Sequence, residues 1–549
     1  MNATFLGSMM PLIALLGPQS SPQSVPPHET YSGPKPATPV RVTQAPLGPG
    51  FFLDLPVSVQ VNIDADGMNV IGDAANEPTI AIDPTNPNRV VIGWREFATI
   101  QSSFREAGVA YSRDAGRSWT NPGVLAPGTF RTDPVLAADN QGNFYYHSLY
   151  GTQLLSCDVF KSTDGGKTWL APVEAGGGDK NWLNVDQSGD TSDGHVYTVW
   201  RRDFSCCGPN IFNRSTDGAV LFEPPVPVSQ NPALGTIAVG PDGEVYVGGV
   251  VIGSWSAFRL AKSTNARDPL LTPTFSTVAV NLGGALGFFA GGPNPGGLLG
   301  QVWVVTDHSG GPTRGNVYML CSVDPPGADP MDLHIVRSTD GGLTFGAPVR
   351  INDDPTGTNA WQWFGTLSIA PNGRLDAAWC DTRDSGQTNI ARVYYSYSAD
   401  AGQTWSSNVA ITPPFDSTIG YPMQNKIGDY YHMVSDNVGA SLAYSATFAG
   451  GQDIYFVRIG DFDCNGNGVA DTLDINQGAS ADVNGNGIPD ECECIGDLDD
   501  DGVIGQSDLG LLLSCFGQPG QDCGDLTGDG ETDQADLGVL LASYGRACD

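Results

Sequence analysis

The segment Ser162-Thr163-Asp164-Gly165-Gly166-Lys167-Thr168-Trp169 decides the fold, because close copies of it recur along the chain. Similar segments begin at residues 112, 338 and 398, and eroded copies begin at 215 and 263. The unit therefore repeats every 48 to 75 residues. Repetition on this scale, in a chain of short strand-like segments, is typical of a β-propeller or a solenoid.

The repeated segment predicts a tight hairpin turn. The Asp164 carboxylate can accept hydrogen bonds from amides of the turn that follows it, and glycine supplies a positive φ there. The final Trp169 leaves the turn to pack between neighbouring sheets. No side chain of the pattern is chemically reactive, so we expect a structural role. The pattern resembles the Asp-box (BNR) repeat of sialidases and similar propellers, and this resemblance implies an all-β, sialidase-like β-propeller.

Strand-like segments between the repeats predict the number of blades. Seven of them have the pattern of inner strands followed by Gly, Asn or Pro turns, and they cover residues 79–83, 135–139, 183–186, 236–239, 302–305, 366–369 and 432–434. Seven blades are therefore predicted, with six as the alternative because sialidases have six and the spacing around 283–300 is irregular. Pairing of segment 57–63 with 453–459 would close the ring and remove both sheet edges.

The composition favours a β protein with few basic residues. The 549 residues include 71 Gly and 40 Pro but 26 Lys plus Arg, which favours short strands over long helices. The net charge of -34 argues against nucleic acid or an anionic membrane surface as the main partner. Residues 461–549 hold 20 Asp plus Glu and one basic residue, Arg546. This acidic tail is predicted to be a separate unit that attracts cations.

The N-terminal part is predicted to lie outside the fold. Residues 1–17 contain an apolar stretch like that of a signal peptide, although no Lys or Arg precedes it and Pro11 interrupts it; the alternative is a disordered leader. Residues 18–55 form a Pro-rich linker, with nine prolines between 18 and 50. No later apolar run reaches the roughly 18 residues that span a bilayer. We expect a secreted or cell-surface protein without a membrane span.

The eleven cysteines fit an oxidising compartment. Five lie in the body, at 157, 206, 207, 321 and 380, so at least one thiol stays free. Six lie in the tail, at 464, 492, 494, 515, 523 and 548, an even number that suits disulfides in a small domain with little core. Zinc is not expected, because Cys492 and Cys494 lack a CxxC partner and the six histidines are scattered.

Chain direction places charged and aromatic residues on one rim. If each Asp box joins the third and outer strands, the starts of inner strands and the ends of second strands share the opposite side, where we expect any pocket. Sialidases hold the substrate carboxylate with three arginines, and use a Tyr with a Glu partner as nucleophile and an Asp as acid/base. The resemblance implies these roles for Arg95, Arg202 and Arg383, for Tyr430 with Glu77, and for Asp133.

The match to sialidase chemistry is incomplete. The family's Phe/Tyr-Arg-Ile-Pro signature is absent, and Asn76-Glu77-Pro78 stands in its place, with an acid where the first arginine belongs. The charges could instead pair with each other around the channel mouth. Two functions therefore stay open. One is a protein that binds a glycan or an extracellular protein at its rim. The alternative is a sialidase-like exo-glycosidase that cleaves terminal acidic sugars.

The last part of the tail contains a duplicated loop and helix. Oxygen-bearing residues alternate around a Gly at the sixth position, which is the spacing of a calcium loop in which Asp replaces the terminal Glu. The predicted ligands are Asp497, Asp499, Asp501, Val503 and Asp508 in one loop, and Asp525, Thr527, Asp529, Glu531, Asp533 and Asp536 in the other. The arrangement resembles a type I dockerin, whose partner is a cohesin module. Gln506-Ser507 and Gln534-Ala535 replace the recognition pair that is commonly Ser-Thr.

Two further acidic loops precede this pair. Their predicted ligands are Asp463, Asn465, Asn467, Val469, Asp471 and Asp474 in the first, and Asp482, Asn484, Asn486, Ile488, Asp490 and Glu493 in the second. They resemble thrombospondin type 3 calcium repeats. Carboxylate and amide oxygens suit Ca²⁺ rather than a transition metal, and the alternative is an acidic disordered tail. We expect Ca²⁺ to compact the tail, because its crowded carboxylates otherwise repel each other.

These patterns divide the chain into five parts. They are a possible signal peptide (1–17), a Pro-rich linker (18–55), a propeller (56–460), thrombospondin-like repeats (461–494) and a dockerin-like domain (495–549). The tail is expected to attach the propeller to a cohesin-like partner or to a surface.

Overall fold

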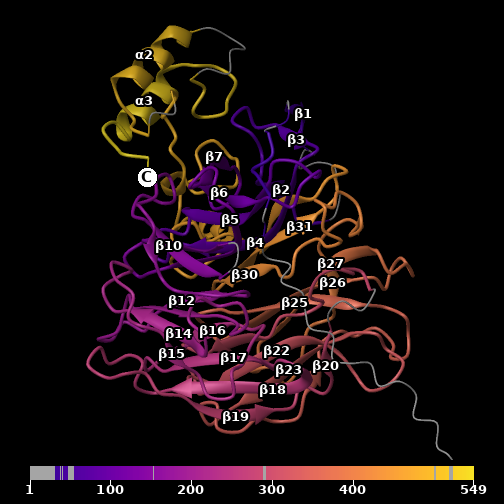
Figure 1. Cartoon of the computed structure of the whole chain (residues 1–549). Coiled ribbons are helices and arrows are strands. Elements are labelled where there is room, and N and C mark those ends of the chain that lie inside the picture. Colours follow the sequence, from indigo (N-terminus) through magenta and orange to yellow (C-terminus); the bar gives the residue numbers. More distant parts are fainter. Residues whose placement is uncertain are drawn as a thin grey trace, which may run out of the picture.

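Seven antiparallel sheets surround a central axis in the computed structural model of the chain (Figure 1). The structure describes residues 31, 33–37, 39, 41–46, 55–151, 154–287, 292–499, 502–517 and 524–548. The predicted signal peptide, the predicted ligand Asp501 and Cys523 lie outside the described residues. The fold is an all-β, seven-bladed propeller, as the sequence predicts, and the six-bladed alternative is wrong.

The first six blades place their strands in chain order from the axis outward. In the first blade the inner strand β4 (Ala74–Ile82) is followed by β5 (Val90–Phe97), β6 (Glu106–Ser112) and β7 (Thr120–Leu125). Inner strands are rich in apolar residues because both of their faces pack inside the ring, whereas the outer strand β7 is half exposed.

The other blades follow the same plan. Blade two has β8 (Arg131–Ala138), β9 (Phe144–Tyr150), β10 (Ser156–Ser162) and β11 (Val173–Glu174), and blade three has β12 (Trp182–Val185), β13 (Val196–Val199), β14 (Asn210–Ser215) and β15 (Val226–Pro227). Blade four has β16 (Ile237–Val239), β17 (Val245–Val251), β18 (Ser254–Ser263) and β19 (Ser276–Val280), and blade five has β21 (Trp303–Thr306), β22 (Val317–Asp324), β23 (Asp332–Ser338) and β24 (Val349–Arg350), with β20 (Ala285–Leu286) beside β22. Blade six has β25 (Gln362–Ile369), β26 (Leu375–Asp381), β27 (Ile390–Ser398) and β28 (Val409–Ala410), with β29 (Phe415–Asp416) beside β27.

The seventh blade closes the ring with strands from both ends of the propeller. It consists of β30 (His432–Ser435), β31 (Gly439–Ala446), β32 (Asp453–Gly460) and β2 (Ser58–Gln60). Strand β2 pairs antiparallel with β32, and Ser58 lies opposite Val457. The predicted closure is confirmed, and it covers the edge that β32 would otherwise leave open.

The repeated Asp segments form turns between the third and outer strands. In the second blade, Ser162 Oγ donates to Asp164 Oδ1 at 2.8 Å, and the Thr168 N–H donates to the same oxygen at 2.9 Å. Gly166 has a φ of +88°, and a Cβ there would lie 2.6 Å from Val91 of the preceding blade. The turns therefore lock neighbouring blades together. We call the side on which they lie the Asp-box face and the opposite side the rim face.

Part of the predicted linker contacts the propeller. Strand β1 (Val42–Gln44) pairs with β3 (Asn69–Ile71). The Tyr31 ring stacks on Phe130 with 5.9 Å between the ring centres, and Lys35 Nζ lies 2.9 Å from Glu106 Oε1. These contacts differ from the prediction that the whole linker lies outside the fold, because proline content says nothing about isolated aromatic anchors.

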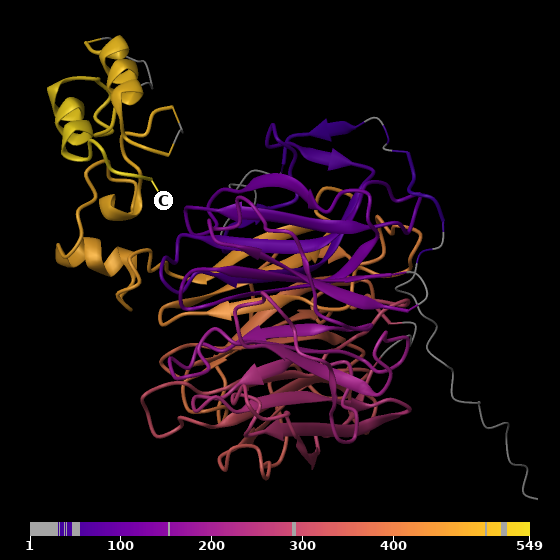
Figure 2. The same ribbon diagram turned by 60° about the vertical axis from the view of Figure 1, so that its left-hand side comes forward.

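The tail lies beside the first blade, on the side where β5, β6 and β7 run (Figures 1 and 2). Its helices are α1 (Asp471–Gln477), the 3-10 turn η2 (Asp490–Cys492), α2 (Gln506–Cys515) and α3 (Gln534–Ala542). Disulfides join Cys464 to Cys492 and Cys494 to Cys548, and a further one joins the adjacent Cys206 and Cys207 of the propeller. Cys157, Cys321 and Cys380 are free and buried. Within the described part of the chain, no helix has the length and apolar character to cross a membrane.

Candidate functional site

Three strained charged residues lie at or just before the rim ends of inner strands. Glu77, Asp133 and Lys180 have φ values of 53°, 47° and 54°. Strands β4 and β8 shift register where the first two of these residues lie. A non-glycine residue in this conformation costs about 1–3 kcal/mol, and a bulge re-aims its side chain. The fold therefore places these three charges at an energetic cost, which is a common property of functional sites.

The three side chains belong to one buried ion network at the centre of the rim face. Lys180 Nζ lies 2.6 Å from Asp429 Oδ2 and 3.5 Å from Asp133 Oδ2. Lys426 Nζ lies 2.7 Å from Asp429 Oδ2 and 3.4 Å from Glu77 Oε1. The network joins the first, second, third and seventh blades. Removal of any one charge would leave a buried partner unpaired, which is strongly destabilising.

Glu77 is fully buried within this network. Arg95 Nε lies 3.2 Å from Glu77 Oε2 and donates to Asn76 Oδ1 at 2.8 Å. Gly428, with a φ of +98°, passes so close that a Cβ would lie 2.9 Å from Glu77 Cγ. Burial raises the pKa of Glu77 to about 8, although the charges of Arg95 and Lys426 oppose this shift. The neighbours of the Glu77 carboxyl in these contacts are all protein groups.

Tyr430 is also buried and already engaged. Its hydroxyl donates to the Pro134 carbonyl at 2.7 Å, and its ring packs edge-on against Trp182 at 5.3 Å. Burial, and next the negative charge of Glu77, raises the pKa of Tyr430 well above its ordinary value. The phenolate is therefore disfavoured, so this geometry does not activate the hydroxyl as a nucleophile.

The three predicted arginines have different surroundings. Arg95 is buried in the ion pair of the first blade. Arg383 donates through Nε to Asp381 Oδ2 at 2.9 Å, and its Nη1 lies 2.6 Å from Asp353 Oδ1. Arg202 leaves 57% of its side chain exposed. All three guanidinium groups thus lie near carboxylates of the protein itself, but the pair of Arg202 Nη2 with Asp203 Oδ1 is long, at 3.8 Å, and Arg202 is the one that faces solvent.

Sequence reasoning missed Lys426, although it contacts two members of the network. It lies in the segment Gln424-Asn425-Lys426-Ile427-Gly428, which has no repeat and no strand pattern. Its partner Asp429 directly precedes the predicted site residue Tyr430. No signal in one sequence identifies the lysine that meets it.

An exposed patch lies beside the network on the rim face. Leu154 is 65% exposed and Phe204 is 38% exposed, and Arg202, which is also exposed, lies in the same loop as Phe204. The Leu155 N–H donates to the Phe204 carbonyl at 2.9 Å, and Leu155 forms a parallel bridge with Ser205. The patch therefore combines aliphatic, aromatic and cationic side chains on a backbone that is hydrogen-bonded between two blades. We call Leu154, Arg202 and Phe204 the rim patch.

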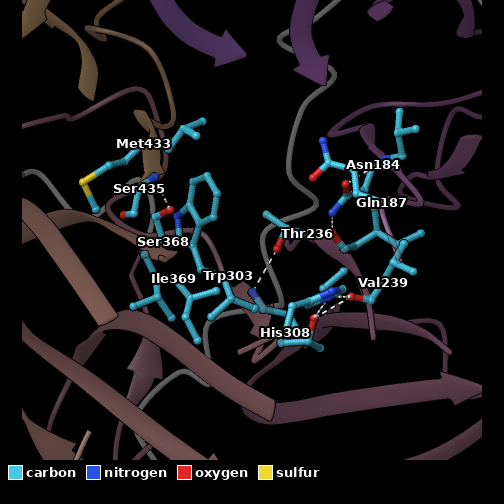
Figure 3. A pocket seen from close by; sticks show the side chains of 18 of the residues that line it. Asn184, Gln187, Thr236, Val239, Trp303, His308, Ser368, Ile369, Met433 and Ser435 are labelled. Atoms are coloured by element: carbon cyan, nitrogen blue, oxygen red, sulfur yellow. Dashed lines mark hydrogen bonds between the residues drawn. The ribbon is translucent and has the colours of Figure 1, made fainter. Parts of the chain in front are cut away.

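A cavity of about 420 Å³ lies at the other end of the axis, among the inner strands β12, β16, β21, β25 and β30 (Figure 3). Trp182, Trp303 and His432 lie at its inner end, and the ends of inner strands surround it on the Asp-box face. The sequence predicts a pocket on the rim face. The cavity lies on the other side because buried ion pairs and aromatic rings fill the axis toward the rim.

The four acidic loops of the tail share one turn. In each loop the N–H of the sixth-position glycine donates to the first-position Asp, at 2.8 to 3.0 Å. The pairs are Gly468 with Asp463, Gly487 with Asp482, Gly502 with Asp497, and Gly530 with Asp525. The twelfth-position acid then folds back onto its own loop. The spacing seen in the sequence therefore corresponds to a repeated three-dimensional turn.

The third loop brings acidic oxygens together most closely. Ligand atoms of Asp497, Asp499 and Asp508 all lie within 4.8 Å of one another. Two other clusters contain cysteine, but those cysteines are in disulfides and supply no thiolate. A donor set made of oxygens fits a hard cation.

Other predicted ligands form hydrogen bonds within their own loops. In the first and second loops the side-chain amides of Asn465 and Asn467 donate to Asp474, and those of Asn484 and Asn486 donate to Glu493. In the fourth loop Asp536 accepts from the N–H of Thr527 at 2.9 Å, and Asp533 caps α3 by accepting from the Ala535 N–H. These polar contacts keep the oxygen-bearing side chains on the inside of each loop.

Comparison with known proteins finds remote structural similarity to other proteins. No protein-family model and no curated protein matches the sequence. Similar solved structures include a protein of unknown function from Dyadobacter fermentans, with 15% identity over 73% of this chain and 97% of that chain and a TM-score of 0.42. The BP39L lectin from Burkholderia pseudomallei has 14% identity over 70% and 96% and a TM-score of 0.44, and a Trypanosoma rangeli sialidase has 12% identity over 74% and 60% and a TM-score of 0.34. At TM-scores below 0.5, these similarities carry no argument about this chain.

Proposed function

We propose that the protein is a binding propeller that holds a glycan or an extracellular protein on its rim face, and that a Ca²⁺-loaded, dockerin-like tail attaches it elsewhere. The observation that carries this proposal is the buried ion network at the centre of the rim face. Its acids and cations contact one another, with Arg95, Lys180 and Lys426 lying against Glu77, Asp133 and Asp429.

This network argues against the alternative exo-glycosidase. Hydrolysis by the sialidase route needs a Tyr that reacts with the sugar and arginines free to grip its carboxylate. Here Tyr430 donates to a backbone carbonyl, and Arg95 and Arg383 are paired with acids of the protein. Arg202 alone would offer one point of charge, whereas a bidentate grip needs an oriented guanidinium.

The rim patch supports binding. Aromatic and arginine side chains are enriched where proteins recognise partners, and hydrogen-bonded loops reduce the entropy lost on binding. The patch is further stiffened by the Cys206–Cys207 disulfide, which directly follows Ser205. A glycan can stack on Phe204, and a protein can bury Leu154 and Phe204 together.

The test compares turnover with binding in the full chain. We expect no release of fluorophore from a fluorogenic sialoside in Ca²⁺, and capture of ligands on a glycan array or from a panel of extracellular proteins. Phe204→Ala should weaken that capture about tenfold, since a central aromatic contact is worth more than 1 kcal/mol. Leu221→Ala, which changes an exposed residue in the eroded Asp box, is the matched control. Turnover that Arg383→Ala abolishes would instead establish the glycosidase.

The proposal for the tail is Ca²⁺ binding by its four loops. It is supported by the shared turn, by the all-oxygen donors and by the convergence of Asp497, Asp499 and Asp508. Bound Ca²⁺ would neutralise carboxylates that otherwise repel, so binding and folding are coupled. Isothermal titration calorimetry with Ca²⁺, on the full chain after a chelator has removed divalent cations, tests this directly. Mg²⁺ is the control because it demands a tighter octahedral site.

Export and attachment complete the proposal. The tail disulfides suit an oxidising compartment, which favours a secreted or cell-surface protein. A cohesin-like module is the proposed partner of the paired helices α2 and α3, whose outer faces leave Leu513 and Leu541 exposed. Co-elution of the full chain with a cohesin module, in Ca²⁺ and in chelator, tests the partner.

A further inference from the structure

We infer that the disulfide between Cys206 and Cys207 is a redox switch that sets the conformation of the rim patch. The inference rests on the proposed function, because it concerns regulation of the same patch. Residues 202–208, which we call the rim loop, carry Arg202 and Phe204 of the patch as well as both cysteines. A change in the disulfide therefore acts within a few residues of the side chains that would meet a ligand.

The disulfide of the rim loop is accessible to solvent. Cys206 is exposed and Cys207 is half-buried. In the two described disulfides of the tail, by contrast, Cys464 is buried and the other three cysteines are half-buried. Exchange begins when a thiolate attacks a sulfur that it can reach, so an external reductant should react with the rim loop first.

The two cysteines are neighbours in the sequence, which makes their bond easy to reduce. Neighbouring Cα atoms of a trans peptide are about 3.8 Å apart, whereas those of ordinary disulfides are usually about 4.4–6.8 Å apart. The bond therefore closes a small ring that includes the backbone between the cysteines and restricts that backbone. A disulfide that is both exposed and constrained belongs to the labile class rather than to the structural class.

Hydrogen bonds connect this ring to both parts of the patch. The Cys206 N–H donates to the Leu155 carbonyl at 2.8 Å. The Leu155 N–H in turn donates to the Phe204 carbonyl at 2.9 Å. Leu154 directly precedes Leu155, so the backbone that carries Leu154 is tied to the rim loop at two points. Movement of the Cys206 backbone therefore reaches both apolar side chains of the patch.

Phe204 has a backbone conformation that its surroundings must enforce. Its φ is 65°, in the left-handed region that a bulky residue rarely adopts, and such strain persists only where neighbouring contacts impose it. One such contact is the Cys207 N–H, which donates to Ser205 Oγ at 3.0 Å, while that hydroxyl donates to the Gly177 carbonyl at 2.8 Å. Opening of the disulfide frees the backbone that follows Phe204, so we expect the Phe204 ring to change its position.

The free thiol of Cys157 lies close to the disulfide but does not attack it. The backbone of Gly177 contacts both sulfurs, because a Cβ on Gly177 would overlap Cys157 Sγ and the Gly177 N–H donates to Cys206 Sγ at 3.4 Å. Burial raises the pKa of Cys157 well above its ordinary value, so its reactive thiolate is scarce. Reduction therefore needs a thiol from outside the protein. Cys206 Sγ also lies 3.4 Å from the Gly177 carbonyl, which can accept from the thiol that forms.

The reaction is a thiol–disulfide exchange with an external dithiol. One thiolate of the dithiol attacks the exposed Sγ of Cys206, forms a mixed disulfide and releases Cys207 as a thiolate, which takes up a proton. The second thiolate of the dithiol then attacks the reagent's own sulfur in the mixed disulfide and releases Cys206, which is protonated in turn. Two electrons pass to the protein and the dithiol becomes a disulfide, and the reverse exchange closes the ring again.

The experiment treats the full chain in Ca²⁺ with graded concentrations of dithiothreitol. Free thiols are trapped with an alkylating reagent and located by mass spectrometry. We expect Cys206 and Cys207 to be alkylated at dithiothreitol concentrations at least about tenfold lower than those that open Cys464–Cys492 and Cys494–Cys548. Amide hydrogen exchange on the same samples should rise about tenfold in the rim loop and stay unchanged in β12 and β13.

A double variant tests the switch without a reductant. Cys206→Ser, Cys207→Ser should exchange in the rim loop as the reduced parent chain does and should no longer respond to dithiothreitol. Cys494→Ser, Cys548→Ser, which removes a disulfide of the tail, is the matched control. Its rim loop should exchange as in the oxidised parent and should still respond. If the first variant does not fold, the reduced parent chain itself supplies the open state.

Exchange in the rim loop decides the inference whether or not a ligand is known. Equal protection of the rim loop in both redox states overturns it, and so does reduction of the tail disulfides before Cys206–Cys207. Ligands captured by the oxidised chain should bind about tenfold more weakly to the reduced chain, because the patch is then less preorganised. Unchanged capture by a chain whose rim loop has opened overturns the inference too. Failure of the oxidised chain to capture any ligand contradicts the proposed function alone.

Discussion

The propeller and the tail are stabilised by different physical means. Packed side chains hold the propeller, in which large aromatic residues such as Trp94, Trp363 and Trp379 are almost completely buried. The paired helices of the tail share four buried apolar residues, Ile504, Leu512, Leu526 and Leu540. Disulfides and the acidic loops supply the remaining stabilisation of the tail. The same chain therefore contains one unit that folds on hydrophobic burial and another that depends on cross-links and ions.

This difference explains why the two units carry their charges differently. The propeller pairs its buried acids with Arg and Lys, so its core needs no external ion. The tail has 20 acidic residues and one basic residue, and its carboxylates face one another across short loops. A cation is the simplest way to relieve that repulsion. Treatments that act on one unit alone test whether the two units are stabilised differently.

Removal of divalent cations should have the largest effect, and on the tail alone. In chelator we expect amide hydrogen exchange in α2 and α3 to approach that of unfolded chain, while β4, β5 and β6 keep their protection, because four apolar residues bury too little surface. Exchange measured by mass spectrometry on the full chain gives both values at once. Asp508→Asn should imitate chelation in part, and Asp66→Asn, an exposed acid of the propeller, should not. Equal protection of the tail with and without Ca²⁺ would contradict the proposed dependence.

Loss of the Cys494–Cys548 disulfide should have the second-largest effect. The cross-link spans 54 residues, and closing a loop of that length stabilises the folded state by about 4 kcal/mol in the chain-entropy model. We expect the Cys494→Ser, Cys548→Ser double variant to unfold its tail at lower denaturant concentration while the propeller transition stays in place. Cys206→Ser, Cys207→Ser is the control, because adjacent cysteines close no long loop. A tail transition unchanged within error would mean that packing, rather than the cross-link, holds the tail.

The pH dependence of stability should have opposite signs in the two units. Burial raises the pKa of Asp73 to about 9, of Glu96 to about 7 and of Asp453 to about 6, and repulsion from neighbouring acids adds to the shifts of Asp73 and Glu96. Their ordinary values in unfolded chain are about 4, so the folded propeller keeps protons that the unfolded chain releases. This stability is complete below pH 4 and is lost as the pH rises through 6, 7 and 9.

The stability of the tail should change with pH in the opposite direction. Burial works to raise the pKa of Asp508, but hydrogen bonds from three backbone N–H groups outweigh it and lower the pKa, and Asp536 is similar. That stability is present above the ordinary carboxyl pKa of about 4 and is lost as the pH falls below it. Calorimetric scans from pH 7 to pH 9, above the range in which the buried His147 and His432 affect stability, should show the propeller transition falling with pH, with a smaller slope in Asp73→Asn, whereas scans from pH 5 down to pH 3 should show the tail transition falling. A propeller that becomes more stable between pH 6 and 9 would contradict the assignment.

The sequence predicted what depends on local pattern and failed where contacts are distant. The Asp segments and strand spacing were enough for seven blades, and the alternating oxygens were enough for the shared turn of the tail loops. The meeting of Lys180 with Asp429 brings together residues 249 positions apart, and no periodicity encodes it. The cavity was placed at the wrong end for the same reason, because its inner end is set by rings from three blades.

The smallest predicted effect concerns the contact between the two units. Arg117 of the first Asp box lies with Nη2 3.6 Å from Asp471 Oδ2 of the first acidic loop, and its guanidinium lies 3.8 Å from the centre of the Phe462 ring. A partly buried ion pair and a cation–π contact of this kind are worth about 1–2 kcal/mol together. We expect Arg117→Ala to increase hydrogen exchange in residues 461–474 by the corresponding factor of about ten and to leave the propeller strands unchanged.

The second Asp box supplies the matched control for this contact. Lys167 occupies the position equivalent to Arg117 and is exposed, so Lys167→Ala should change nothing in residues 461–474. If both variants loosen the first loop equally, general attraction between a basic turn and an acidic tail holds the units together, and the effect should vanish in high salt. If only Arg117→Ala loosens residues 461–474, the first Asp box of the propeller also holds the tail in place. Loosening by neither variant would mean that the loop is fixed by its own turn and by the Cys464–Cys492 disulfide, without help from the propeller.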